Sequence, residues 1–157
     1  MRSSKIHFFT IPILFLVFFS SCKKEEENPV PYVYVNFTIN LMNDPEFFFL
    51  QTQGSTAVIK SSTIGAISLG YNDNGVIIYN EGFYQFLAFD CTCPYDLPSN
   101  VAVKASEFDG VATCPVCGSK YVFSSSGVPT LDSPAKWPLK EYKAFYNPNT
   151  GDLVISN

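Results

Sequence analysis

The chain has 157 residues, about the length of one domain, and its 15% charged and 16% aromatic residues exclude an intrinsically disordered chain. The net charge is −4 and no stretch is both basic and aromatic, so we predict no nucleic-acid partner. The single histidine, His7, lies near the N-terminus. If it is removed with a leader, the mature chain has no Ser-His-Asp or Cys-His catalysis and no histidine-zinc site.

Residues 1–21 predict such a leader. A basic start with Arg2 and Lys5 precedes an apolar run over residues 6–19, and Ser20-Ser21-Cys22 follows. The run is shorter than the roughly 20 residues that cross a bilayer as a helix. The small-small-Cys ending resembles a bacterial lipoprotein signal, which implies that Cys22 is lipidated. An ordinary signal peptide that leaves Cys22 free is the alternative.

Residues 22–31 then form a charged, proline-bearing tether, and the segment 23–27 also resembles a surface-export signal. These features predict a lipid-anchored protein of the bacterial cell envelope, at the outer membrane and either periplasmic or surface-exposed. Its membrane contact would be made through the lipid at Cys22.

Residues 32–157 predict one all-β domain, an antiparallel barrel or sandwich. Apolar and polar residues alternate from Val33 to Leu41, as in a strand with one buried face. Further short β-rich runs follow, separated by turn signals, and only Ser61–Ile67 could form a helical turn. The runs are 47–51, 56–60, 75–79, 83–89, 120–123, 139–146 and 152–155.

The segment from Asp90 to Ser119 is predicted to be loop-like, and it carries the remaining four cysteines, Cys91, Cys93, Cys114 and Cys117. A C-x-C pair and a C-x-x-C pair on tight loops can converge on zinc, a single iron or an iron–sulfur cluster. Disulfides are the alternative in an exported protein. A thioredoxin-like role fits poorly, because a turn and a strand follow Cys117 where that role needs a helix.

The sequence Cys-Pro-Val-Cys-Gly-Ser-Lys-Tyr at 114–121 resembles the second cluster loop of Rieske [2Fe–2S] proteins, C-P-x-H-G-S-x-Y, with Cys117 in place of histidine. The segments 127–129, 133–135 and 138–142 resemble the stretch that covers the cluster and returns to the β domain. The resemblance is dense over residues 83–155. It implies a Rieske-like domain over 32–157, with a small metal-binding subdomain at about 90–123.

Two registers match the first cluster loop of that family, C-x-H. In one, Cys91-Thr92-Cys93 matches and Cys93 replaces the histidine. In the other, Cys93-Pro94-Tyr95 matches the common C-P-H form, Tyr95 replaces the histidine, and Cys91 is an extra cysteine. Neither register contains a histidine, so both family histidines are absent.

The resemblance implies a [2Fe–2S] cluster that carries one electron at a time, with Cys91, Cys93, Cys114 and Cys117 as ligands and an unidentified redox partner. Ser119 and Tyr121 match residues that donate hydrogen bonds to cluster sulfurs in the family. Thiolates in place of imidazoles make the site more negative. They therefore shift its potential from the Rieske range, about −150 to +300 mV, toward the −400 mV of four-cysteine clusters. We therefore predict an electron-transfer or binding module rather than a stand-alone enzyme.

The second hypothesis is a non-redox structural or binding lipoprotein whose four cysteines hold zinc or form disulfides. Arg2 is the only arginine, so a twin-arginine route for folded export is not encoded. A cluster would then be assembled outside the cytoplasm, whereas zinc needs no assembly machinery. The acids Asp90, Asp96 and Asp109 flank the cysteine loops and are interpreted as solvated carboxylates.

Overall fold

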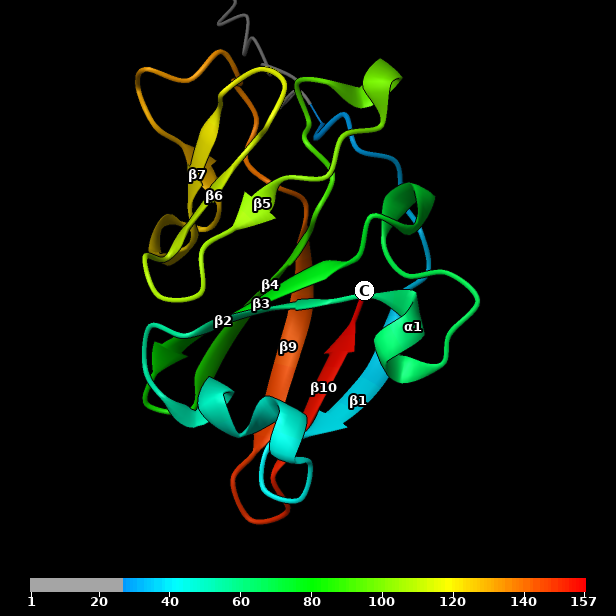
Figure 1. Cartoon of the computed structure of the whole chain (residues 1–157), viewed down its shortest axis with the longest axis vertical. Helices are drawn as coiled ribbons and strands as arrows, with labels where there is room; N and C mark the ends of the chain where they lie inside the picture. The colour runs from blue at the N-terminus through cyan, green and yellow to red at the C-terminus, as the bar shows by residue number, and fades with distance from the viewer. Residues whose placement is uncertain (1–26) are drawn as a thin grey trace, which may run out of the picture.

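The computed structural model describes residues 27–157, which form two antiparallel sheets (Figure 1). The larger sheet has six strands in the order β1-β10-β9-β4-β3-β2, and the smaller has four in the order β5-β6-β7-β8. The predicted all-β antiparallel class is confirmed. The predictions for the leader and for Cys22 concern residues outside the described range. The strands are β1 Asn36–Asn40, β2 Thr56–Ile59, β3 Val76–Gly82, β4 Gln85–Asp90, β5 Lys104–Ala105, β6 Val111–Thr113, β7 Lys120–Val122, β8 Val128–Pro129, β9 Glu141–Asn147 and β10 Asp152–Ser156.

Strands β3 and β4 lie between two hydrophobic cores. Val76 and Ile78 face the core of the six-stranded sheet, whereas Ile77 between them faces the core shared with the smaller sheet. A strand buried on both faces is a continuous apolar run rather than an alternating one. We call the core of the six-stranded sheet the first core and the one shared with the smaller sheet the second core. In β4, Ala88 faces the first core and Phe89 faces the second. The cysteine loops therefore rest on the same two strands that organise the larger sheet.

The prediction of a strand over residues 47–51 is wrong, because this segment lies in the 3-10 helix η1, Pro45–Gln51. The Asp44 side chain accepts a hydrogen bond from the Glu46 amide, and proline stands at the start of the helix, where its missing N–H costs nothing. Phe47 and Leu50, three residues apart, are the buried side chains. The other helices are α1 Ser61–Ile64, which fulfils the predicted single turn, and the 3-10 segments η2 Tyr71–Asp73, η3 Leu97–Ser99 and η4 Phe123–Ser125.

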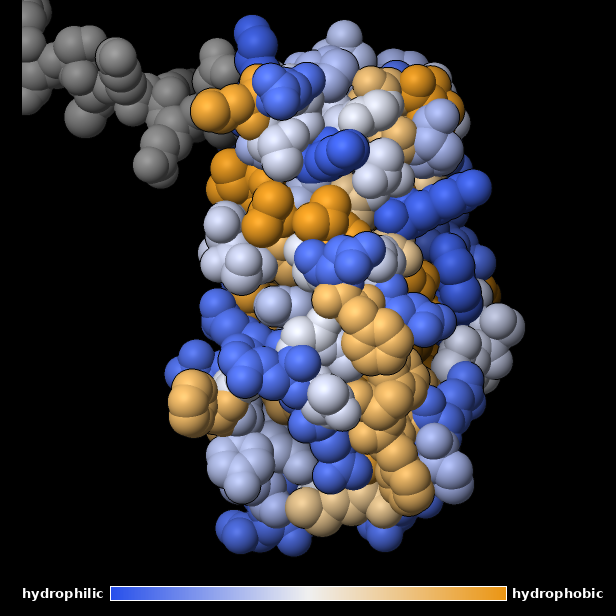
Figure 2. Space-filling view, turned by 60° about the vertical axis from the view of Figure 1, so that its left-hand side comes forward, coloured by the Kyte–Doolittle hydropathy of each residue, from blue (hydrophilic) through white to orange (hydrophobic). Residues whose placement is uncertain are grey.

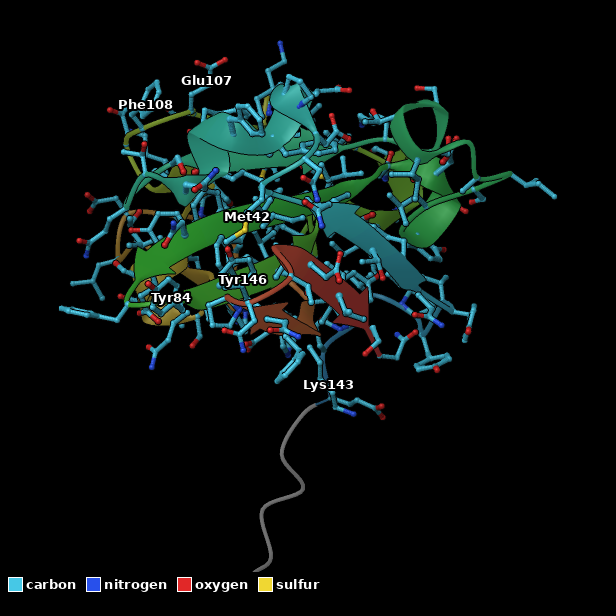
Figure 3. The ribbon with its side chains drawn as sticks, turned by 90° about the horizontal axis from the view of Figure 1, so that it is seen from below. Met42, Tyr84, Glu107, Phe108, Lys143 and Tyr146 are labelled. Carbon is cyan, nitrogen blue, oxygen red and sulfur yellow. The ribbon has the colours of Figure 1, made fainter. Side chains whose placement is uncertain are left out.

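The predicted run over 83–89 divides into a turn and a strand. Gly82 pairs with Gln85, so Phe83 and Tyr84 form the two-residue loop between β3 and β4. Tyr84, in this turn, lies beside Tyr146 of β9 (Figure 3). Two short strands, β5 and β6, lie within the segment 90–119 that was predicted to be loop-like.

The cysteine loops and the first described residues share one end of the molecule, and the β3–β4 turn lies toward the other (Figure 1). The Asn28 amide donates to the Pro138 carbonyl at 2.9 Å, and the Lys140 ammonium donates to the Val30 carbonyl at 3.1 Å. No helix among residues 27–157 is long and apolar enough to cross a membrane. One face carries a strip of hydrophobic residues between hydrophilic ones (Figure 2).

Candidate metal centre

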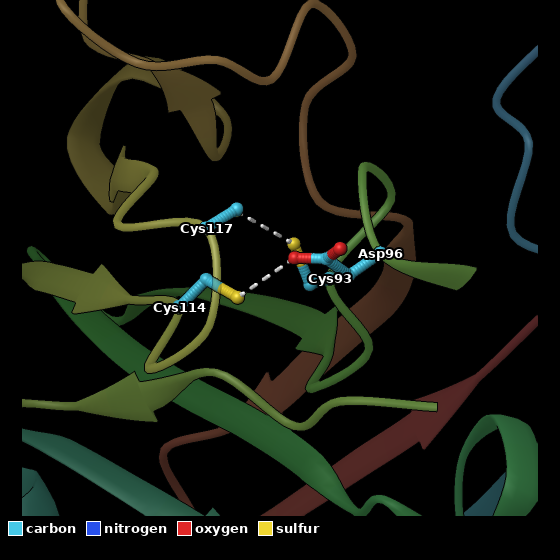
Figure 4. A group of neighbouring side chains, drawn as sticks. All are labelled: Cys93, Asp96, Cys114 and Cys117. Atoms are coloured by element: carbon cyan, nitrogen blue, oxygen red, sulfur yellow. Dashed lines mark hydrogen bonds between the residues drawn. The ribbon is translucent and has the colours of Figure 1, made fainter. Parts of the chain in front are cut away.

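Two loops bring four potential metal ligands together. The thiols of Cys93, Cys114 and Cys117 and a carboxylate oxygen of Asp96 all lie within 4.8 Å of one another (Figure 4). Cys93 and Cys114 are buried, and Asp96 and Cys117 are half-buried. The group therefore sits at the surface of the second core, with one side toward solvent.

The second loop is a tight turn that directs two thiols to the same side. The Cys114 amide donates to the Ser119 carbonyl at 2.8 Å, and the Gly118 amide donates to the Cys114 carbonyl at 3.0 Å. The turn needs a left-handed residue at Gly118, where φ is +75°, and glycine adopts this conformation without steric cost. The short strands β6 and β7 hold both ends of the loop.

The first loop is held by pairing with the segment that follows it. The Cys93 amide donates to the Val101 carbonyl at 2.9 Å, and Thr92 forms an isolated bridge with Ala102. Asp96 directly precedes η3, and the Cys114 thiol donates to its carboxylate at 3.7 Å. Asp96 thus faces the second loop, although it was interpreted as a solvated acid.

The sequence contains a signal that identifies Asp96. The first loop reads Cys-Pro-Tyr-Asp at 93–96 and the second Cys-Pro-Val-Cys at 114–117. In both loops a second ligand residue lies three positions after the cysteine of a Cys-Pro pair. Asp96 occupies in the first loop the position that Cys117 occupies in the second, a correspondence that the C-x-C interpretation does not reveal.

Cys91 is not part of the group of four. Its side chain is fully buried in the core between the sheets, on the same side of the chain as Phe89. Its amide donates to the Gly75 carbonyl at 3.0 Å, and its carbonyl accepts from the Val103 amide at 2.7 Å. Burial raises the pKa of the Cys91 thiol to about 12. The structure therefore brings together three of the four predicted ligands and places Cys91 among hydrophobic side chains.

Ser119 and Tyr121 contact two of the thiols. The Tyr121 hydroxyl lies 3.2 Å from the Cys93 sulfur, and the Cys117 thiol donates to the Ser119 hydroxyl at 3.1 Å. The Ser119 oxygen also accepts from the Ala135 amide at 3.1 Å, which fixes its position. Burial is the main cause that raises the pKa of Tyr121, so its hydroxyl stays a proton donor at neutral pH.

The protonation of the thiols sets a condition for metal binding. Burial raises the pKa of Cys114 to about 12, with opposing contributions from the amides of Cys117 and Val116. A metal ion binds the thiolate, so binding at neutral pH must release this proton. The four cysteines at 91, 93, 114 and 117 are all free thiols.

The spacing of the donor atoms suits a small metal centre. A tetrahedral zinc site with Zn–S bonds of about 2.3 Å separates its sulfurs by roughly 3.8 Å. The Cys93 and Cys117 sulfurs are 3.7 Å apart, and the Cys114 sulfur is 3.7 Å from the Asp96 carboxylate. A [2Fe–2S] cluster also takes four protein ligands, which here would be three thiolates and one carboxylate.

Comparisons with known proteins give distant structural similarities. No protein-family model matches the chain, and no curated protein matches it. The chain is similar to the ferredoxin of carbazole 1,9a-dioxygenase from Nocardioides aromaticivorans IC177, at 12% identity and a TM-score of 0.46 over 79% of this chain and 97% of that one. It is also similar to a Sphingomonas yanoikuyae B1 ferredoxin, at 16% identity and a TM-score of 0.45 over 68% and 88%.

A third similarity is to a chain in the complex of reduced oxygenase and oxidized ferredoxin in carbazole 1,9a-dioxygenase. The identity is 18% and the TM-score 0.46, over 67% of this chain and 82% of that one.

Proposed function

We propose that this chain is an envelope lipoprotein whose β domain holds a [2Fe–2S] cluster and transfers single electrons. The ligands would be Cys93, Cys114 and Cys117, with Asp96 as the fourth. The cluster supplies the electron-accepting chemistry, and the domain supplies binding, orientation and electrostatics. The partner would be a redox protein that reaches the half-buried side of the site, at Asp96 and Cys117.

The observation that carries the proposal is the position of two hydroxyl groups against two ligand thiols. The Tyr121 oxygen is 3.2 Å from the Cys93 sulfur, and the Ser119 oxygen is 3.1 Å from the Cys117 sulfur. In a loaded site these sulfurs are thiolates, and both hydroxyls would donate to them. Hydrogen bonds of this kind offset negative charge and raise the reduction potential of an iron–sulfur centre. They favour the register in which Cys93 is the first ligand.

A second candidate is a structural or binding lipoprotein with one zinc ion at the same four residues. The four donor atoms all lie within 4.8 Å of one another, and this spacing favours the zinc site. One tetrahedral ion fits it, whereas a centre with two irons needs a wider site. Zinc would join the two loops and stabilise the fold, without redox chemistry.

The test is metal analysis of the full-length protein purified without oxygen. A cluster gives visible absorbance together with iron and acid-labile sulfide in equal amounts. A colourless protein with one zinc per chain would support the second candidate and contradict the first. A protein with neither metal contradicts both.

The lipid anchor is tested separately by replacing Cys22. The wild-type protein is expected in the membrane fraction, because the lipid supplies the attachment. The Cys22→Ala variant should be soluble and carry no lipid by mass spectrometry. A wild-type protein without lipid at Cys22 would show that the leader is an ordinary signal peptide.

A further inference from the structure

An aromatic groove lies away from the cysteine loops, beside the β3–β4 turn. Its volume is about 320 Å³, near the lower end of ligand pockets in proteins. It is lined by residues of η1, β3, β4 and β9, of the β3–β4 turn, and of the segments that follow β1 and η1. Its features do not depend on what the cysteine site binds.

Aromatic rings line the groove, and those of Phe83 and Tyr84 are open to solvent. Tyr84 and Tyr146 stack with ring centroids 5.9 Å apart and an angle of 24° between their planes (Figure 3). Phe86 supports Tyr146 from the core side, at 5.2 Å. Tyr84 is 70% exposed and Phe83 is 93% exposed. The rings therefore offer flat apolar faces at the surface, on a support of packed aromatic side chains.

The conformation of the turn is unfavourable for the residues that form it. Phe83 has φ +50° and Tyr84 has φ +64°, values that a two-residue hairpin turn normally fills with asparagine and glycine. Bulky side chains in this region strain the backbone, and such strain concentrates at functional sites. Two exposed aromatic residues in a strained turn are hard to explain by stability, since neither is buried.

Amide side chains supply the polar part of the lining. The Gln51 amide nitrogen donates to the Leu41 carbonyl at 2.6 Å, and the Gln53 nitrogen donates to the Glu81 carbonyl at 3.0 Å. These bonds orient both amides. Within residues 27–157, no group donates a hydrogen bond to the side-chain oxygen of either glutamine. Each side chain therefore has free hydrogen-bonding capacity in a fixed orientation.

Of the described residues that line the groove, none carries a charge. An ionic ligand would find no partner there, so the groove suits an uncharged one. It is also unsuited to an extended peptide, because β3 is paired on both sides, with β2 and with β4, and offers no free main-chain edge.

We propose that this groove binds neutral carbohydrate. A sugar ring has a face of C–H groups, which packs on the negative face of an aromatic ring, and a rim of hydroxyls, which pair with amide oxygens and N–H groups. Tyr84 is the stacking residue, Tyr146 supports its other face, and Gln51 and Gln53 are the hydrogen-bonding residues. The groove accommodates one or two sugar rings of an oligosaccharide.

The test is calorimetric titration of the full-length protein with cellohexaose, maltohexaose and xylohexaose, and with an oligogalacturonate of equal length as the charged probe. At least one neutral oligosaccharide should bind, and the charged one should not. Tyr84→Ala should raise the Kd about tenfold, the loss expected when one stacking ring is removed. Gln53→Ala should also weaken binding.

Phe145→Ala is the matched control, because this ring is 68% exposed on the same strand as Tyr146 and does not line the groove. Its Kd should stay within about twofold of wild type. The proposal is overturned if no neutral oligosaccharide binds, if the oligogalacturonate binds as tightly, or if the control weakens binding as much as Tyr84→Ala. An uncharged hexapeptide is titrated in the same way, and tighter binding of the peptide than of every oligosaccharide would also overturn the proposal.

Discussion

The described cysteines have two different environments. Cys93, Cys114 and Cys117 meet Asp96 at the edge of the second core, whereas Cys91 is enclosed by it. A buried thiol outside a metal site behaves as a small hydrophobic side chain. The C-x-C motif therefore consists of one candidate ligand and one packing residue.

Substitution of single cysteines separates these roles. Cys93→Ala should abolish metal binding, since it removes a ligand from the group of four. Cys91→Ala should keep full metal content and lose about 1 kcal/mol of unfolding free energy, because it removes one buried sulfur. Metal content and urea denaturation of both variants give the readout. Equal metal loss in the two variants would show that Cys91 is a ligand.

Tyr142 predicts a dependence of stability on alkaline pH. Its hydroxyl donates to the buried Asp90 carboxylate at 2.6 Å, and burial, followed by the charge of Asp90, raises its pKa above the usual 10.0. The contribution of the Tyr142 hydroxyl to the unfolding free energy is fully present below about pH 10, and it is lost as pH rises through the folded-state pKa. Wild-type stability should fall above pH 10.

Tyr142→Phe removes the titrating group and one hydrogen bond to a charged acceptor. We expect it to lose about 2 kcal/mol at pH 7. Above pH 10 its stability should fall less steeply than that of wild type, by at most about 1.4 kcal/mol per pH unit. Urea denaturation from pH 7 to 11 measures both effects. Tyr121, whose pKa is also raised, contributes the same pH dependence in both proteins. Parallel pH profiles of wild type and variant would therefore contradict the assignment to Tyr142.

At the scale of elements, two segments show when local sequence misleads and when it is a sound guide. The residues Phe47-Phe48-Phe49 favour a strand, yet the Asp44-Pro45 pair begins a helix there, and one face of it is buried. In β3, by contrast, the apolar run correctly predicted a strand, because both of its faces are buried. Propensity was decisive only where the flanking residues agreed with it.

The β3–β4 turn predicts a gain in stability from substitution. Phe83→Asn combined with Tyr84→Gly gives the pair that a turn with two positive φ angles prefers. We expect an increase of about 1–3 kcal/mol in unfolding free energy, since each strained residue costs that order of energy. The same double variant should lose the proposed carbohydrate binding.

Phe108→Asn is the control for this double variant. Phe108 is 64% exposed and does not belong to the residues with positive φ. Its substitution removes a comparable ring from a relaxed backbone, so stability should change by less than about 0.5 kcal/mol. An equal gain from Phe108→Asn would attribute the effect to lost surface apolarity, and a loss of stability in the double variant would contradict the strain.

At the scale of the whole molecule, the sequence predicted the antiparallel β class and both cysteine loops. It left the register of the first cysteine loop open, because which cysteine turns away depends on how the two sheets pack. The shared Cys-Pro-x-x spacing points to Asp96, but the packing of the two loops is what brings its carboxylate to the thiols. Cys91 follows the side of β4 that Phe89 occupies, and this side faces the smaller sheet. Asp96 directly precedes η3, and its carboxylate meets the Cys114 thiol of the second loop.

The two cores predict that removal of the proposed metal loosens only one part of the molecule. The four ligand residues belong to loops that rest on the second core, whereas β1 and β10 belong to the first. After dialysis against a chelator, amide hydrogen exchange should accelerate in the cysteine loops, β6 and β7. Protection in β1 and β10 should be unchanged, because their contacts do not involve the site.

Cys117→Ser gives the matched control for this experiment. It should show the fast exchange of the loops before any chelator is added, and dialysis should then change little. If exchange accelerates equally in both sheets, the two cores unfold as one unit and the metal stabilises the whole fold. If the loops keep their protection without metal, the short strands β6 and β7 and the hydrogen bonds of the two turns suffice to hold the ligands in place, and the binding site is preformed.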